Sequence, residues 1–269
     1  MKASATSIDV FKDGCNVKYI RKYVLKNMPR SVTNRWAALG NIIHAVYEKM
    51  FRFEEFGNQK WLEGLYTKCF NEELKKANVE KVPEKDRGWF YNYGKKLLLQ
   101  GYNTLRNNDL LRKPISVEEW FKVPVGEKEG IEQKDHIITG KMDAVFDNGS
   151  KILVIDYKTG KETPDEKTLR RNVQLTTYSF VISKTLGKDC DLGLLYPKHE
   201  KILLTNRTPR DHKKLFVTLA EMTEMDKVTS EVELPTINPS PKACQYCELG
   251  LLGKCEGPAQ IGFTYDQSH

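Results

Sequence analysis

The segment Gly140–Lys161 reads GKMDAVFDNGSKILVIDYKTGK and constrains the fold more than any other part of the chain. An Asn-Gly pair stands between two apolar runs, which is a strong signal for a β-hairpin. The second run, Ile152–Ile155, holds only Ile, Leu and Val, as expected for a central strand buried on both faces. We therefore predict two paired strands, at 137–146 and 151–157, in the middle of a sheet.

The patterns on either side of this hairpin predict the order α, β-β-β, α, β-β, α along the chain. Helices are predicted at 35–53, 61–77, 86–106, 167–186 and 210–225, and further strands at 115–125, 191–196 and 201–206. This order indicates an α/β fold in which a mixed central β-sheet is flanked by helices. It divides the chain into a helical N-terminal part (1–112), a core (113–227) and a tail (228–269). In the tail, an extended strap containing prolines leads to a cysteine cluster.

The balance of charged residues permits a polyanionic partner. Lys and Arg together number 43 against 36 Asp and Glu, which leaves a net charge of +7. The longest purely aliphatic stretch, Ile152–Ile155, is too short to span a bilayer, and no apolar block follows Lys2 near the N-terminus. These features predict a soluble protein of the cytoplasm without membrane association.

Two aspartates and a lysine are expected at one end of the predicted hairpin. Because side chains alternate along a strand, Asp156 and Lys158 project from the same face. Pairing through the turn at 148–149 places residue 143 opposite residue 154, one diagonal step from Asp156. Two carboxylates close together suit a hard divalent cation such as Mg²⁺ or Mn²⁺. For an isolated Asp-x-Lys, however, a salt bridge at the strand end is the more common interpretation.

A histidine on the predicted helix 35–53 is a further candidate ligand. Gly40 and His44 are four residues apart and share one face of this helix, beside its apolar stripe. Gly40 would allow another segment to approach closely, and His44 would then be a third metal ligand. The alternative is that His44 is a half-buried packing residue.

Polar residues on the predicted helix 167–186 suit contacts with a nucleic acid. Gln174 and Tyr178 share a face of this helix and follow the basic pair Arg170 and Arg171. Arg170, Arg171 and Tyr178 are therefore candidate nucleic-acid contacts, with ordinary polar helix positions as the alternative.

The cysteines near the C-terminus have metal-binding spacing. Cys244, Cys247 and Cys255 form C-x2-C-x7-C, in which the first two sulfurs can face one metal from a tight turn. Three thiolates require a fourth ligand, and Cys15 is the candidate. A set of four cysteines is typical of zinc or iron–sulfur sites. Cys69 is expected on a helix and Cys190 at a strand start, as buried free thiols.

Four short motifs occur in a defined order along the chain: GxxxH at Gly40–His44, GxxD at Gly140–Asp143, DYKTG at Asp156–Gly160 and QLxxY at Gln174–Tyr178. Together they resemble the RecB-like nucleases of the PD-(D/E)XK superfamily, including the CRISPR-associated exonucleases that carry an iron–sulfur cluster. The resemblance covers about residues 44–178 and the terminal cysteines. It implies a restriction-endonuclease-like PD-(D/E)XK core at 113–227.

The resemblance also implies roles for single residues. Mg²⁺ or Mn²⁺ would be held by His44, Asp143, Asp156 and the backbone carbonyl of Tyr157. Lys158 would be the catalytic lysine, and the catalytic set would also include Asp143, Asp156, Gln174 and Tyr178. A 4Fe-4S cluster would be bound by Cys15, Cys244, Cys247 and Cys255, joining the two ends of the chain. Structural Zn²⁺ is the alternative, because the last spacing of seven is longer than is usual in these relatives.

The leading functional hypothesis is a metal-dependent DNA exonuclease that acts on single-stranded ends in DNA repair, recombination or replication of a bacterium or phage. The sequence contains no G-x-x-x-x-G-K-[ST] motif, so unwinding would come from a helicase or recombination partner. The alternatives are a non-catalytic nucleic-acid-binding scaffold within a repair complex and a structure- or sequence-specific endonuclease. The aromatic residues Trp89, Phe90, Tyr91 and Tyr93 would serve either as stacking platforms for bases or as helix core.

Overall fold

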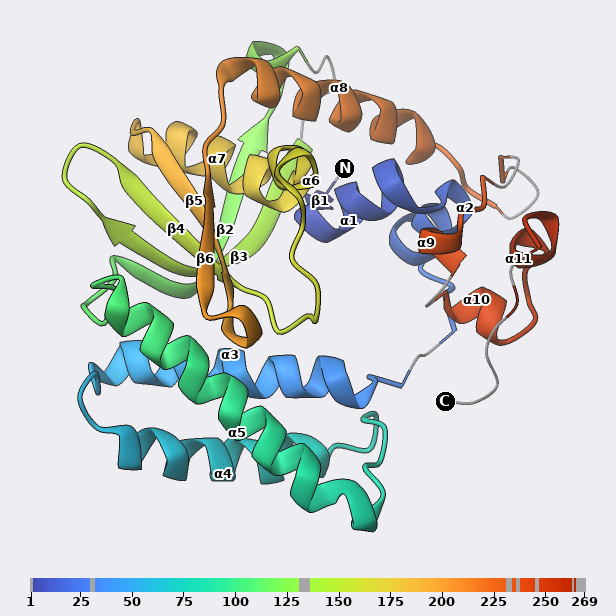
Figure 1. Cartoon of the computed structure of the whole chain (residues 1–269). Helices are drawn as coiled ribbons and strands as arrows, with labels where there is room; N and C mark the ends of the chain where they lie inside the picture. The colour runs from blue at the N-terminus through green and yellow to red at the C-terminus, as the bar shows by residue number, and fades with distance from the viewer. Residues whose placement is uncertain are drawn as a thin grey trace.

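A six-stranded mixed sheet forms the centre of the protein (Figure 1). The computed structural model describes residues 2–29, 32–130, 136–230, 234–235, 238–244, 247–262 and 264. Its strands are β1 (Lys2–Ser4), β2 (Ser116–Val125), β3 (His136–Asp147), β4 (Ile152–Tyr157), β5 (Cys190–Tyr196) and β6 (Lys201–Thr205). The sheet order is β1-β3-β4-β5-β6, with β2 also paired to β3. β1 runs parallel to β3 and β4 parallel to β5, while the other pairs are antiparallel, which confirms the predicted mixed sheet.

Helices cover both faces of this sheet (Figure 1). One layer consists of α3 (Arg35–Phe53), α4 (Gln59–Leu74) and α5 (Glu84–Asn107). The other contains α1 (Ala5–Asp9), α6 (Glu166–Arg171), α7 (Val173–Leu186) and α8 (Pro209–Met225). The shorter elements are α2 (Asn16–Tyr19), α9 (Pro241–Cys244), α10 (Glu248–Leu251), α11 (Gly257–Gln260), π-helical turns at Val10–Gly14 and Ile20–Val24, and 3-10 turns at Glu127–Glu129 and Pro197–His199. No helix within the described ranges has both the length and the apolar character needed to cross a membrane.

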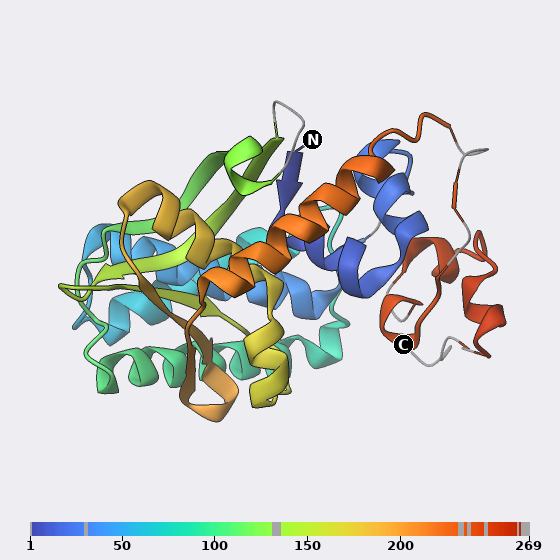
Figure 2. The ribbon, with the colours of Figure 1, turned by 90° about the horizontal axis from the view of Figure 1, so that it is seen from above.

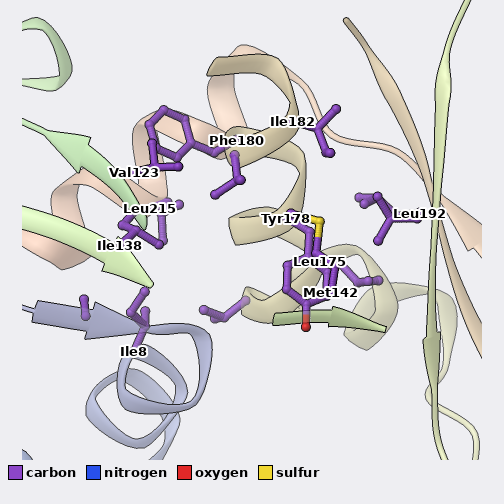
Figure 3. Packing of buried hydrophobic residues seen from close by; sticks show 14 of the residues in the cluster. Ile8, Val123, Ile138, Met142, Leu175, Tyr178, Phe180, Ile182, Leu192 and Leu215 are labelled. Carbon is purple, nitrogen blue, oxygen red and sulfur yellow. The ribbon is translucent and has the colours of Figure 1, made fainter. Parts of the chain in front are cut away.

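Each face of the sheet has its own hydrophobic core, because successive residues of a strand point to opposite faces. On β4, Val154 packs in the core beneath α7 and α8, whereas Ile155 packs in the core beneath α3 and α5. Figure 3 shows part of the first core, where Met142 of β3 lies beside Leu175 and Tyr178 of α7. All six residues of β4 are buried, as predicted for a central strand.

The predicted hairpin is present, but its register differs from the prediction by two residues. Val145 pairs with Val154, and the same register places Asp143 opposite Asp156 instead of opposite residue 154. The cause is the connection: residues 148–151 form a four-residue loop, which a backbone hydrogen bond of 2.9 Å closes between its first and last residues. The longer loop moves the two aspartates into direct opposition across the strands.

The helix predicted at 167–186 is two helices, and the prediction of one continuous helix was wrong. α7 begins after Asn172, whose side chain accepts a hydrogen bond of 2.9 Å from the backbone N–H of Leu175. The Arg207 guanidinium donates to the carbonyl oxygens of Leu169 (2.9 Å) and Asn172 (3.2 Å). A side-chain cap and a half-buried arginine therefore replace the helical hydrogen bonds at the break.

Residues 10–24 lie beside the C-terminal helices α9 and α10 (Figures 1 and 2). The backbone N–H of Asn16 donates to Asn238 Oδ1 (2.8 Å), and Lys18 forms an ion pair with Glu248 (3.3 Å). The sequence did not predict that β1 joins the sheet or that short helices α9 to α11 form around the cysteines. Of the predicted strap at 228–241, residues 231–233 and 236–237 lie outside the described residues.

Candidate active site

His44 faces the end of the hairpin from the middle of α3. Asn34 caps the start of this helix, which begins where the sequence predicted. A Cβ on Gly40, one turn before His44, would lie 3.1 Å from Thr159 Oγ1, so the glycine lets the loop after β4 approach the helix closely, as predicted. His44 Nε2 lies 3.0 Å from the carbonyl oxygen of Tyr157, the last residue of β4.

Two acidic residues, Asp143 on β3 and Glu118 on β2, lie beside His44. The Glu118 Oε1 atom lies 3.3 Å from His44 Nδ1, and Asp143 Oδ2 lies 3.4 Å from the same nitrogen. Glu118 has a left-handed backbone with φ of 48°, and the β2–β3 ladder is interrupted between Glu118 and Asp143. Strained backbone of this kind in a strand is held by its surroundings and is common at functional sites.

The sequence did not single out Glu118. The available signal was the consecutive pair Glu118 and Glu119, which breaks the alternation of the strand. The contact between Glu118 and His44 spans 74 positions of the chain, so no local pattern could reveal it.

His44 is surrounded by hydrogen-bond acceptors on both ring nitrogens. Nε2 faces the Tyr157 carbonyl, and Nδ1 faces the carboxylates of Asp143 and Glu118. Burial alone lowers the pKa of His44, but hydrogen bonds to Asp143 and Glu118 outweigh burial and raise this pKa to about 10. Because acceptors on both sides favour two N–H donors, His44 is an imidazolium in this arrangement. It must lose a proton before it can bind a metal ion.

Asp156 is the buried carboxylate at the end of β4. It is 1% exposed, and its pKa is raised to about 6, first by burial and then by the negative charge of Asp143. Lys158 Nζ lies 2.7 Å from Asp156 Oδ2 as an ion pair, yet this oxygen accepts no aligned hydrogen bond. Oδ1 is 3.4 Å from the Tyr178 hydroxyl. Asp156 thus retains free lone pairs. Because its negative charge is buried, a nearby cation that neutralises this charge would be favoured.

Lys158 is held by a chain of hydrogen bonds from α7. Its ammonium donates to Gln174 Oε1 (2.7 Å), and Gln174 Nε2 in turn donates to the Tyr178 hydroxyl (2.7 Å). The Tyr178 hydroxyl donates to the carbonyl oxygen of Lys141 on β3 (2.8 Å). Burial lowers the pKa of Lys158, but the charge of Asp156 outweighs it and the pKa is raised, so the lysine is cationic. The Gln-x-x-x-Tyr pair therefore positions this lysine.

The glycine of the GxxD motif makes room for a ring that packs against Tyr178 of α7. A Cβ on Gly140 would lie 2.7 Å from the ring of Phe121, which in turn packs edge to face on Tyr178 at a centroid distance of 6.2 Å. A side chain at Gly140 would displace this ring and the tyrosine behind it.

The arrangement fits a hard divalent cation. One ligand atom each from His44, Glu118 and Asp143 lie within 4.8 Å of one another, the only such group of His, Cys, Asp or Glu in the described parts of the chain. Asp156 is outside this group, although the charge of Asp143 acts on Asp156. The Tyr157 carbonyl lies at the edge of the group through its contact with His44. Carboxylate and carbonyl oxygens with one imidazole are donors that Mg²⁺ and Mn²⁺ accept.

The basic pair predicted to contact nucleic acid lies elsewhere. Arg170 forms an exposed ion pair with Glu166 (3.0 Å). Arg171 lines a shallow pocket with Lys12 and Lys214, on the side of α7 away from Gln174. Among the described residues, neither arginine shares a hydrogen bond or an ion pair with the groups around His44 and Lys158.

The four cysteines predicted to share a metal line one small pocket. Cys15 comes from the N-terminal segment, and Cys244, Cys247 and Cys255 come from the C-terminal segment. Burial raises the pKa of the Cys15 and Cys244 thiols. No three sulfur atoms in the described ranges lie within 4.8 Å of one another, so the thiols surround the pocket without being clustered at ligand distances. Cys69 and Cys190 are buried free thiols, as predicted.

The protein thus has a mixed α/β fold in which a histidine from α3 meets carboxylates and a lysine at the end of the central hairpin. The sequence matches the model of the PD-(D/E)XK nuclease superfamily over residues 2–250. The chain therefore belongs to this superfamily, as its motifs predicted.

Two known proteins show what the chain is similar to. It is 26% identical over 200 residues to an ATP-dependent helicase/nuclease subunit of Clostridium novyi (strain NT), a match that covers 73% of this chain and 16% of that protein. The chain thus spans about a sixth of that relative. A solved structure from Eubacterium rectale, of a protein proposed to be an exonuclease, matches with a TM-score of 0.51 and 11% identity. It covers 94% of this chain and 88% of the other, and supports the fold alone.

Proposed function

We propose that this protein is a Mg²⁺- or Mn²⁺-dependent DNA exonuclease. The observation that carries the proposal is the convergence of His44, Glu118 and Asp143 beside the buried Asp156 and the half-buried Lys158 paired with it. Membership of a nuclease superfamily supports the reaction class, and the net charge of +7 supports a polyanionic substrate.

The residues of this chain would divide the work of phosphodiester hydrolysis. A divalent cation, when bound, supplies Lewis-acid stabilisation of the phosphoryl oxygen and acidifies bound water. His44, Asp143, Asp156, the Tyr157 carbonyl and Glu118 would hold it. The Lys158 ammonium would orient the attacking water and stabilise negative charge that develops on the phosphoryl group. Gln174 and Tyr178 would keep the ammonium in place through their hydrogen bonds.

The biological setting is proposed from the relatives. The Clostridium novyi protein is described as part of a helicase/nuclease, and the Eubacterium rectale protein is proposed to be an exonuclease. We infer that this chain acts on single-stranded DNA ends, with a helicase or recombination partner, in repair, recombination or replication of a bacterium or phage.

End-labelled DNA tests this function directly. Single-stranded DNA labelled separately at each end is incubated with Mg²⁺, Mn²⁺ or EDTA, with the Asp156→Ala variant alongside. We expect metal-dependent release of short products from one labelled end, which also reports the polarity, and no release by the variant. Internal cuts would instead indicate an endonuclease. Binding without cleavage under either metal would indicate a nucleic-acid-binding scaffold.

Cation binding is expected to strengthen with rising pH. His44 has a pKa raised to about 10 without a cation, so a cation competes with a proton at this residue. We expect the Mg²⁺ concentration that gives half-maximal thermal stabilisation to fall by up to about tenfold per pH unit between about pH 7 and pH 9. Glu118→Gln removes an acceptor and should lower the pKa of His44, so that the affinity for Mg²⁺ stops rising at a lower pH. Because the variant also lacks one candidate ligand, its affinity at that plateau should be weaker than that of the wild type. Glu119→Gln, on the exposed neighbour, serves as control. A response independent of pH would contradict ligation by His44.

We also propose that the pocket lined by Cys15, Cys244, Cys247 and Cys255 binds a 4Fe-4S cluster, with structural Zn²⁺ as the alternative. Four thiols on one pocket are a donor set that either group accepts. The contacts of Asn16 with Asn238 and of Lys18 with Glu248 already bring the two chain ends together. A metal group at this point would close a loop of more than 200 residues, which supports a structural role.

Cys247→Ser tests this second site. We expect loss of the bound metal and a melting temperature lower by about 10 °C or more, because metal binding at such sites contributes to folding. Cys69→Ser, at a buried thiol remote from the pocket, should retain the metal. Anaerobically purified protein should contain about four iron atoms per chain and absorb visible light. Stoichiometric zinc would replace the iron–sulfur assignment, and absence of both metals would refute the site.

A further inference from the structure

The loop after β4 runs along α3 away from the candidate active site. His44 Nε2 lies 3.0 Å from the Tyr157 carbonyl, and one turn earlier a Cβ on Gly40 would lie 3.1 Å from Thr159 Oγ1. Four helical residues rise about 6 Å, which matches two residues of extended chain. The loop therefore advances along α3 at the same rate as the helix, toward the first turn of α3. We call this shared path the track.

Three aromatic rings, two of them exposed, lie at the far end of this track. Trp36 lies one turn before Gly40 and is 38% exposed, and the ammonium of Lys161 lies 5.7 Å from its ring centroid. Trp89 and Tyr93, one turn apart on α5, are stacked with ring centroids 5.4 Å apart. Both rings meet Trp36 edge to face, at centroid distances of 6.1 Å and 5.8 Å. We call Trp36, Trp89 and Tyr93 the aromatic platform.

The two tryptophans of the platform are exposed, unlike the helix core beside them. Phe90 is 1% exposed and packs beneath Trp36, whereas Trp89 is 59% exposed. The aromatic stretch on α5 thus contains both a core ring, Phe90, and an exposed ring, Trp89. Two cations, Arg35 and Lys161, lie over the Trp36 ring.

We propose that the aromatic platform binds unpaired bases of a nucleic acid strand whose phosphodiester lies at the candidate active site. Single-strand binding sites combine aromatic rings, on which bases stack, with cations that bind the phosphates. The platform offers both. An apolar protein partner would not require Arg35 and Lys161 at the same ring. Trp36 and His44 are eight residues apart on one helix, or about 12 Å. This distance corresponds to roughly three to four nucleotides at the 3.4 Å stacked spacing.

This inference rests on the proposed nuclease function, because a strand bound on the platform is a substrate only if the candidate active site at the other end of the track cleaves it. It adds the surface that would bind the unpaired bases of the proposed single-stranded substrate. In a duplex, the faces of each base are covered by the neighbouring base pairs. Stacking on the platform would require these bases to unstack, so we expect duplex DNA not to bind there.

Binding of labelled oligothymidylate in a Lys158→Met background separates recognition from cleavage. We expect Trp36→Ala and Trp89→Ala each to weaken binding by about tenfold or more, since base stacking contributes about 1–3 kcal/mol per base. Trp36→Phe should retain most of the affinity. Phe53→Ala, at an aromatic residue that is 67% exposed near the other end of α3, is the matched control and should bind normally. Lys161→Ala should reduce the slope of log affinity against log salt by about one.

Three results would contradict the proposal that the platform binds unpaired bases. The first is unchanged oligothymidylate affinity in both Trp36→Ala and Trp89→Ala. The second is an equal loss of affinity for blunt duplex, which would indicate general damage. The third is a dimer in sedimentation that Trp36→Ala dissociates, which would make the platform an interface between two copies of the chain.

Cleavage by the otherwise wild-type protein keeps the two proposals apart. If it degrades DNA with Mg²⁺ or Mn²⁺ and the tryptophan variants bind normally, the platform is wrong and the nuclease proposal stands. If it cleaves nothing while the tryptophan variants still lose single-strand binding, the nuclease proposal is wrong and the binding surface stands.

Discussion

Asp156→Asn is expected to reduce DNA cleavage by about a thousandfold or more while the protein remains folded. The change removes a negative charge from the candidate cation site but keeps the size of the side chain. In the wild type, Mg²⁺ should raise the melting temperature, because a ligand that binds only the folded state stabilises it. The variant should lose most of this increase. Activity and thermal unfolding are measured on the same samples, so that a lost site and a lost fold are told apart.

The pH dependence of stability provides a second readout for Asp156. Its pKa is raised to about 6 in the folded protein, so folding favours the protonated carboxyl. Without a cation, this residue therefore costs the wild type stability as pH rises from about 4 to about 6. The variant does not titrate, and its melting temperature relative to wild type should be higher at pH 7.5 than at pH 4.5.

The control for Asp156 is Asp147→Asn, at the opposite end of the hairpin. Asp147 forms an exposed ion pair with Lys188 (3.3 Å). This variant should cleave normally and show no such pH trend. Full activity of Asp156→Asn would refute the assignment of the site.

Lys158→Met is expected to reduce cleavage by about a hundredfold to ten-thousandfold without removing the cation site. The ammonium is 2.7 Å from Asp156 and 2.7 Å from Gln174, so it is directed toward the group of carboxylates. Its removal should leave the Mg²⁺-induced rise in melting temperature intact, or enlarge it, because a competing positive charge is gone. If Lys158→Met loses both the Mg²⁺-induced rise in melting temperature and the cleavage activity, Lys158 acts only by stabilising the cation site.

Lys151→Met is the matched control for Lys158. Lys151 directly precedes β4, whereas Lys158 directly follows it, and Lys151 forms a half-exposed ion pair with Asp191 (3.3 Å). The same substitution there should leave cleavage unchanged. Gln174→Leu, which breaks the hydrogen bond to Lys158, should reduce cleavage less than Lys158→Met does. It acts through the position of the ammonium alone.

Local patterns predicted most of the elements of this fold. α3 begins and ends at the predicted residues, and β4 is the buried central strand that its Ile-Leu-Val run indicated. Periodicity and turn residues are properties of neighbouring positions, so they can be recognised without tertiary contacts. The break in the helix at Asn172 was missed because Arg207, 35 residues further along, supplies part of the reason for it.

The sequence by itself determined the mixed α/β order and the hairpin with Asp143, Asp156 and Lys158 at its end. Only the tertiary structure decided which groups meet there. It brought Glu118 beside His44, set the register that opposes Asp143 and Asp156, and gathered Trp36, Trp89 and Lys161 at the end of one track. These contacts join residues that are distant in the chain, and their formation depends on loop length, backbone strain and packing between layers. Such quantities have no periodic signature in the sequence.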